Sequence, residues 1–132
     1  MKVFFDHNLS PGIARALDAL FMGAHEVVAL KDKFSQDITD EAWIRALNKE
    51  GKWTIISGDR RITRNKAERS VFTSSKLIGF FLSSTLKDAK VTIQMQRILA
   101  VWDEIQMLSE CMNGGALFEI PRKSSKIKQI RL

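Results

Sequence analysis

Residues 3–11 have the sequence VFFDHNLSP, which joins an apolar run, an aspartate and a helix start signal. The apolar run Val3–Phe5 lacks the polar alternation of a half-exposed strand and therefore predicts a strand buried on both faces. Asp6 follows directly. Ser10 and Pro11 are then typical of a helix N-cap and first helical residue. A buried strand that leads through an acidic loop into a helix favours an α/β fold with a parallel sheet.

Short apolar runs and amphipathic helices alternate along the rest of the chain. Further buried strands are predicted at Val27–Leu30, Thr54–Ile56 and Leu77–Phe81. Apolar spacing predicts a helix after Ser10, a second helix that ends near Gly51, and a long helix over Val91–Ile105 with Asp88 as its cap. This strand–helix–strand order predicts an α/β protein whose mainly parallel sheet is covered by helices on both faces.

The size and apolar content of the chain predict one globular domain over residues 1–132, since 45% of its residues are hydrophobic. The runs Leu117–Ile120 and Ile127–Ile130 predict a β-hairpin within a basic C-terminal segment of about residues 117–132. Cys111 is the only cysteine, so no intrachain disulfide can form. No apolar run is long enough to span a bilayer. We therefore expect a soluble cytoplasmic protein with no membrane partner.

Positive charge is concentrated in two segments. The chain has 21 lysines and arginines against 15 acidic residues, a net charge of +6. The first basic segment consists of Arg60, Arg61, Arg64, Lys66 and Arg69. The second runs from Arg122 to Arg131 and contains no acidic residue. Clustered positive charge favours a polyanionic partner through counterion release. A solvated surface with an ordinary basic tail explains the same charge equally well.

Acidic residues lie where predicted strands end and where the second helix begins. Asp6 follows the first strand, Asp59 follows the third, and Asp40 opens the second helix from the same edge of the sheet. Chemistry in parallel α/β proteins gathers beyond the carboxyl ends of the strands. Cysteine-free, oxygen-rich sites suit Mg²⁺ or Mn²⁺. Such an ion can polarise a phosphate and lower the pKa of an attacking water, so we predict a metal centre for phosphodiester cleavage.

Helix phase distinguishes Asp40 from its neighbour Glu41. Asp40 lies four residues before Ile44 and shares its inward face, whereas Glu41 lies four residues before Arg45 on the outward face. We expect Asp40 to bind the metal, although a negative charge at a helix N-terminus also explains it. We expect Glu41 to form an exposed ion pair with Arg45.

Two other acidic residues are secondary candidates for the metal centre. Asp37 lies just outside the second helix, where its side chain can also shape the loop. Asn65 and Glu68 have the spacing of a capping box, which explains Glu68 without a function. Glu68 can alternatively supply an outer ligand. His7 is adjacent to Asp6 and is more often a structural neighbour than a substrate contact in such a position.

Three segments together resemble the PIN-like superfamily. They are residues 3–11 (VFFDHNLSP), 37–44 (DITDEAWI) and 55–62 (IISGDRRI). The resemblance extends over roughly residues 1–110 and is to the small stand-alone branch whose first motif is like DxNLSP. It implies a three-layer α/β/α sandwich and metal-dependent ribonuclease chemistry, often as the toxin of a toxin–antitoxin pair.

The resemblance also implies roles for individual residues. Asp6, Asp40 and Asp59 correspond to the catalytic metal carboxylates, with Asn8 and Ser57 ordering the site beside the substrate. The surrounding basic residues expected to hold the polyanion are Arg60, Arg61, Arg64 and Lys66. Many relatives carry a further acidic residue shortly after the third-motif aspartate, where this chain has arginines. Either of the secondary candidates, Asp37 or Glu68, can replace that residue.

These expectations leave two main hypotheses about the function. The first is an endoribonuclease that uses Mg²⁺ or Mn²⁺ and acts on RNA in preference to DNA. An antitoxin protein and a second copy of the chain, forming a homodimer, are its further partner candidates. The second is a catalytically inactive PIN-like module that binds RNA or a partner protein. A phosphoacceptor receiver domain fits less well, because it requires two adjacent acids after the first strand, and this chain has Asp6 followed by His7.

Overall fold

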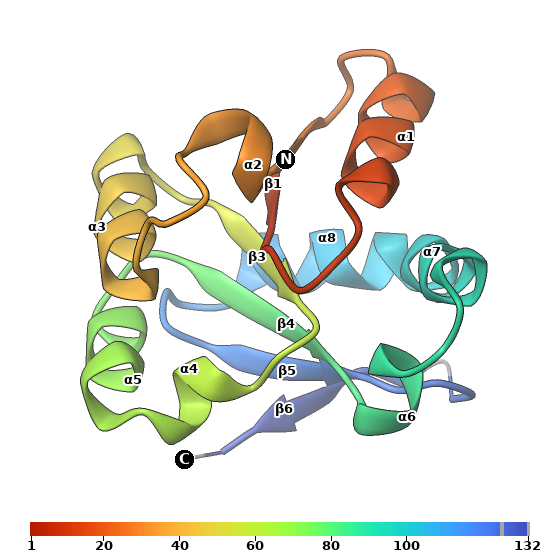
Figure 1. Ribbon diagram of the computed structural model, residues 1–132. Helices are drawn as coiled ribbons and strands as arrows, with labels where there is room; N and C mark the ends of the chain where they lie inside the picture. The colour runs from red at the N-terminus through yellow and green to blue at the C-terminus, as the bar shows by residue number, and fades with distance from the viewer. Residues whose placement is uncertain (125, 132) are drawn as a thin grey trace.

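The computed structural model describes residues 1–124 and 126–131, and a single twisted sheet runs through it (Figure 1). Within these residues, six strands are arranged in the order β2-β1-β3-β4-β5-β6. The strands are β1 (Lys2–Phe5), β2 (Glu26–Ala29), β3 (Thr54–Ser57), β4 (Ile78–Leu82), β5 (Leu117–Ile120) and β6 (Lys128–Ile130). The first five are parallel, and β6 pairs antiparallel with β5. The predicted mainly parallel sheet and C-terminal hairpin are thus confirmed.

Helices cover both faces of the sheet and complete a three-layer α/β/α sandwich (Figure 1). The helices are α1 (Pro11–Phe21), α2 (Leu30–Lys33), α3 (Asp40–Glu50), α4 (Arg61–Arg64), α5 (Lys66–Thr73), α6 (Ser84–Lys87), α7 (Val91–Ala100) and α8 (Trp102–Cys111). Buried residues of α1, α7 and α8 pack on one face of the sheet, and buried residues of α3 and α5 pack on the other. No helix in the described part of the chain is both long and apolar enough to cross a membrane.

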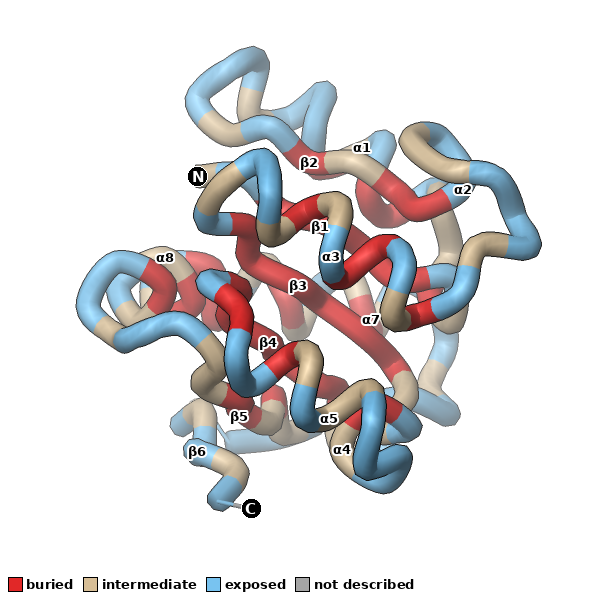
Figure 2. Tube along the Cα trace, turned by 90° about the vertical axis from the view of Figure 1, so that its left-hand side faces the viewer, coloured by how far each residue is buried: buried red, intermediate tan, exposed pale blue. Residues whose placement is uncertain are grey.

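The central strands are buried on both faces, as their continuous apolar sequences predict (Figure 2). In β1, Phe5 belongs to the core under α1 and α7, whereas its neighbour Phe4 packs against Trp43 of α3. Alternate residues of one strand therefore fill two separate cores. This burial fixes the register of β1, since a shift by one residue would exchange the two sets of side chains.

Two predictions about the helices were wrong. The long helix predicted over Val91–Ile105 is two helices, α7 and α8, that meet at Val101, where the backbone leaves helical geometry (φ −109°, ψ 13°). Asp88 caps the end of α6 instead of the start of α7. The reason is local, because the Ser83 hydroxyl accepts a hydrogen bond from the Leu86 amide and starts a short helix directly after β4. The hairpin loop predicted between β5 and β6 includes Ser125, which lies outside the described residues.

Strand register places the candidate site. Phe5 of β1 lies beside Ile56 of β3, and Ser57 of β3 lies beside Phe81 of β4. The loops that follow these strands therefore emerge next to one another at the carboxyl edge of the sheet.

Candidate metal centre

The loops after β1 and β3 are joined by a network of polar side chains. The Ser57 hydroxyl donates to Asp6 Oδ2 over 3.0 Å, and its oxygen accepts from the Asp59 amide over 3.2 Å. Asn8 Nδ2 donates to Asp59 Oδ2 over 3.1 Å. Asp6 is only 3% exposed, and Ser57 is fully buried. Ser57 and Asn8 thus hold the two strand-end carboxylates in fixed orientations.

Asp40 enters the same site from the start of α3. The Thr39 hydroxyl caps this helix by accepting from the Ala42 amide, and Asp40 is its first residue. Its carboxylate is 8% exposed and accepts a hydrogen bond from Trp43 Nε1 over 3.0 Å. Glu41 points outward, 43% exposed and 4.0 Å from Arg45. The orientations predicted from helix phase are therefore confirmed for both residues.

Asp6, His7 and Asp40 form the tightest group of potential metal ligands among the described residues. One ligand atom from each lies within 4.8 Å of the others. Burial raises the pKa of the Asp6 carboxyl, the neighbouring His7 opposes that shift, and the negative charge of Asp40 adds to it. Both carboxylates are largely removed from water, so a cation placed between them would relieve their mutual repulsion.

Asp59 stands next to this group and is linked to it through Ser57 and Arg61. The Arg61 Nε atom is 3.6 Å from Asp59 Oδ2 and 3.7 Å from Asp40 Oδ2. Partial burial acts to raise the pKa of Asp59, but hydrogen bonds from the Asn8 side chain and the Arg61 amide lower it below its usual value. Asp59 is thus a carboxylate that stays ionised beside the buried pair.

Glu68 faces the same centre, and the predicted capping box is only half formed. Asn65 caps α5 by accepting from the Ala67 and Glu68 amides, but its own amide donates to the Arg61 carbonyl. Glu68 therefore does not return the bond that a capping box requires. Burial and the charge of Asp40 raise the pKa of Glu68. Asp37 lies outside the group, exposed, and accepts a hydrogen bond from Ser35.

The predicted substrate-binding arginines occupy different positions around the centre. Arg61 contacts the acidic group directly, and one of its Nη atoms is 3.3 Å from His7 Nε2. Arg60 forms a 2.7 Å ion pair with Glu119 of β5, a partner that sequence spacing did not reveal. Arg64 lines a hollow together with Arg60 and Asp59, whereas Lys66 is exposed at the start of α5.

The residues present fit a hard divalent cation. Three carboxylates supply the oxygen ligands that Mg²⁺ and Mn²⁺ prefer, and the His7 imidazole offers one nitrogen ligand beside them. Two buried oxygen atoms at the edge of this centre, Asn8 Oδ1 and Glu68 Oε2, have no hydrogen-bond partner among the described residues. Buried oxygens without a donor are costly unless a cation or water satisfies them. The carboxylate donors therefore favour a bound metal, and the two atoms leave room for a cation or a water at its edge.

Comparison with known protein families gave a match to the PIN like domain over residues 1–84. The match covers more than half of the chain and includes all three segments that carry the acidic residues. The chain therefore belongs to the PIN-like domain family, which has a nuclease-type fold. Nucleases of this family typically use divalent metals. No curated protein and no solved structure showed significant similarity to the chain.

Proposed function

We propose that this protein is a Mg²⁺- or Mn²⁺-dependent endoribonuclease that hydrolyses phosphodiester bonds at the carboxyl edge of its sheet. The observation that carries the proposal is the meeting of Asp6 and Asp40, both buried, beside Asp59 and within reach of arginine side chains. Buried acids that are brought together from distant segments are costly to keep in a fold, so a functional centre is the natural explanation.

Asp6, Asp40 and Asp59 would hold the ion, with Glu68 as an outer ligand. When bound, the ion supplies Lewis-acid polarisation of the phosphate and lowers the pKa of a bound water. The protein's own contribution is positioning. Ser57, Asn8 and Trp43 each fix one of the carboxylates through a hydrogen bond. Pre-oriented ligands of this kind avoid a reorganisation cost during the reaction.

The basic residues beside the centre would hold the substrate. Arg61 and Arg64 are exposed, so their guanidinium groups can reach a phosphate placed over the acidic group. Guanidinium groups recognise phosphate through paired, charge-assisted hydrogen bonds. The positive charge would hold the polyanion close to a centre whose carboxylates would otherwise repel it.

Incubation of the purified protein with single-stranded and structured RNA tests the proposal. We expect cleavage with Mg²⁺ or Mn²⁺ and none with chelator. The rival function, an inactive module that binds RNA or a partner protein, is favoured by the contacts of Arg61, which already bring a positive charge to Asp40 and Asp59. RNA binding without cleavage under any metal condition would select that rival.

A toxin role, with an antitoxin protein as partner, is a further part of the proposal that rests on family resemblance alone. Controlled expression in a bacterial host tests it. We expect the unaltered chain to arrest growth and an Asp6→Asn variant to leave growth unaffected. Equal growth with both chains would remove the toxin role without affecting the nuclease proposal.

A further inference from the structure

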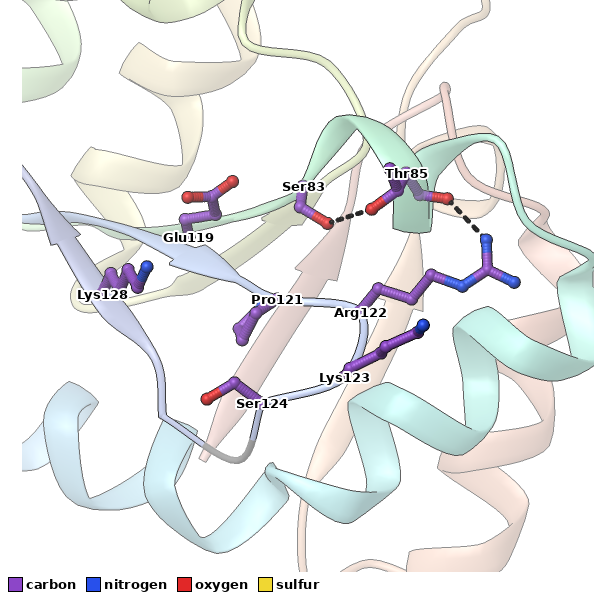
Figure 3. Close-up of a pocket in the computed structure, with 8 residues that line it drawn as sticks. All are labelled: Ser83, Thr85, Glu119, Pro121, Arg122, Lys123, Ser124 and Lys128. Carbon is purple, nitrogen blue, oxygen red and sulfur yellow. Dashed lines mark hydrogen bonds between the residues drawn. The ribbon is translucent and has the colours of Figure 1, made fainter.

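Two adjoining hollows lead away from the acidic centre across the carboxyl ends of β4 and β5. The nearer one has a volume of about 260 Å³, and its lining includes Asp59, Arg60, Arg64, Lys87 and Glu119. The farther one has a volume of about 620 Å³ and lies between the β4–α6 turn and the C-terminal hairpin (Figure 3). Its lining includes Ser83, Thr85, Glu119, Arg122, Lys123 and Lys128. Glu119 lines both hollows. Ser83 lines the farther hollow, and the next residue, Ser84, lines the nearer one.

The charge of this surface, which we call the basic groove, is strongly positive. The basic side chains that line the two hollows are Arg60, Arg64, Lys87, Arg122, Lys123 and Lys128. Among the described residues, two acids line them. Glu119 is already paired with Arg60, and Asp59 belongs to the acidic centre. Within residues 1–124 and 126–131, no carboxylate forms an ion pair with the three basic residues of the farther hollow.

Side chains of the farther hollow are arranged around its opening. The Arg122 guanidinium donates to the Thr85 carbonyl over 3.2 Å, which holds it against the β4–α6 turn. Figure 3 shows Lys128 on β6 at the opposite side of the hollow from Arg122 and Lys123. Positive groups therefore border the space on two sides. A chain of phosphates that passes through it can be contacted from both.

We propose that the basic groove holds single-stranded RNA that extends from the acidic centre towards the C-terminal hairpin. This inference rests on the proposed nuclease function. A single strand can bend between two adjoining hollows, whereas a duplex is stiff over about 150 base pairs, judged from the persistence length of DNA. The lining residues that the structure describes include no aromatic side chain in either hollow, so the contacts are with phosphates rather than stacked bases.

The farther hollow is built by a part of the chain that the family match does not reach. Arg122, Lys123 and Lys128 all lie beyond residue 84, where the match ends. They come to lie beside the nearer hollow because β5 pairs with β4 in parallel and continues the sheet. The acidic centre would thus cut the strand, while the hairpin would hold the nucleotides beside the cut.

Binding without cleavage tests the groove separately from the nuclease proposal. A fluorescently labelled single-stranded RNA 12-mer is titrated in chelator by fluorescence anisotropy over a series of salt concentrations. The test variant is Arg122→Gln, Lys123→Gln and Lys128→Gln together. The control variant is Lys49→Gln, Lys52→Gln and Lys76→Gln, which removes equal charge from exposed positions at the end of α3 and just before β3 and β4. Circular dichroism checks that both are folded.

If each of the three residues neutralises one phosphate, the test variant should flatten the plot of log affinity against log salt by about two units. We also expect at least about tenfold weaker binding at 0.1 M salt, and a single Lys87→Gln change to flatten the slope by about 0.7. The control should keep a slope close to that of the unaltered chain. Equal slopes for the test and control variants would overturn the proposal. Normal groove binding without cleavage in metal would instead overturn only the nuclease function.

Discussion

Replacing Asp40 by asparagine removes one charge from the acidic centre and leaves its surroundings almost unchanged. Asparagine keeps the Oδ1 atom that accepts the hydrogen bond from Trp43, so the start of α3 stays in place. Opposite unit charges 4 Å apart attract by about 1 kcal/mol in bulk water and by about 4 kcal/mol at an effective dielectric near 20. A divalent ion doubles these values. The loss of at least about 2 kcal/mol exceeds the roughly 1.4 kcal/mol that a tenfold change requires.

We therefore expect Asp40→Asn to weaken Mn²⁺ binding and RNA cleavage by at least about tenfold. Glu41→Gln is the matched control, because it makes the same chemical change one residue along the helix. The Glu41 carboxylate is exposed, and its pairing with Arg45 is worth no more than about 0.5 kcal/mol. Calorimetric Mn²⁺ titration and an RNA cleavage assay on both variants decide the matter. Loss of function in Glu41→Gln with normal function in Asp40→Asn would show that Asp40 is not a metal ligand, as would normal function in both.

Three further predictions follow from the contacts around the site and the fold. Arg61→Gln should bind Mn²⁺ several-fold more tightly in calorimetry, because its guanidinium competes with the ion for two carboxylates; unchanged or weaker binding would contradict this. Burial raises the folded-state pKa of Asp6 above its ordinary 3.8. In chelator, the contribution of Asp6 to the free energy of unfolding therefore falls as pH rises from 3.8 through the raised pKa. Asp6→Asn should remove this fall and be at least as stable as the unaltered chain at pH 7 in urea unfolding; a clear loss of stability would count against it. Gly115→Ala should lower stability by about 2 kcal/mol or more, because Gly115 has φ +88° and a Cβ atom there would approach the Thr73 carbonyl oxygen to 2.2 Å; a change below about 0.5 kcal/mol in urea unfolding would contradict the backbone geometry.

Much of the site could be predicted because parallel strands end at a common edge. The apolar run Val3–Phe5 identified a strand buried on both faces, and Asp6 had to emerge from its carboxyl end. Helix phase separated Asp40 from Glu41 without any knowledge of the sheet. Both inferences needed only the side-chain period of a strand or a helix, which a short stretch of sequence reveals.

Other features depend on contacts that spacing in the sequence does not encode. The apolar stripe continues across Val101, so periodicity could not reveal that two helices meet there. The Asn65 amide bonds to the Arg61 carbonyl, and this contact leaves Glu68 free to face the acidic centre. The hairpin was predicted, but its parallel pairing with β4 was not, and that pairing brings Glu119 to Arg60.

Single-turnover cleavage of single-stranded RNA in saturating Mn²⁺ measures whether the acidic centre performs metal-dependent cleavage. The rate is compared between the unaltered chain and an Asp6→Asn variant shown to be folded by circular dichroism. Asp6 is buried, accepts a hydrogen bond from Ser57 and lies within 4.8 Å of Asp40 in the candidate ligand group, so its loss removes one of the central metal ligands. We predict that the unaltered chain cleaves the RNA and that the variant does not. Cleavage by folded Asp6→Asn at the rate of the unaltered chain would mean that the acidic centre does not perform the cleavage.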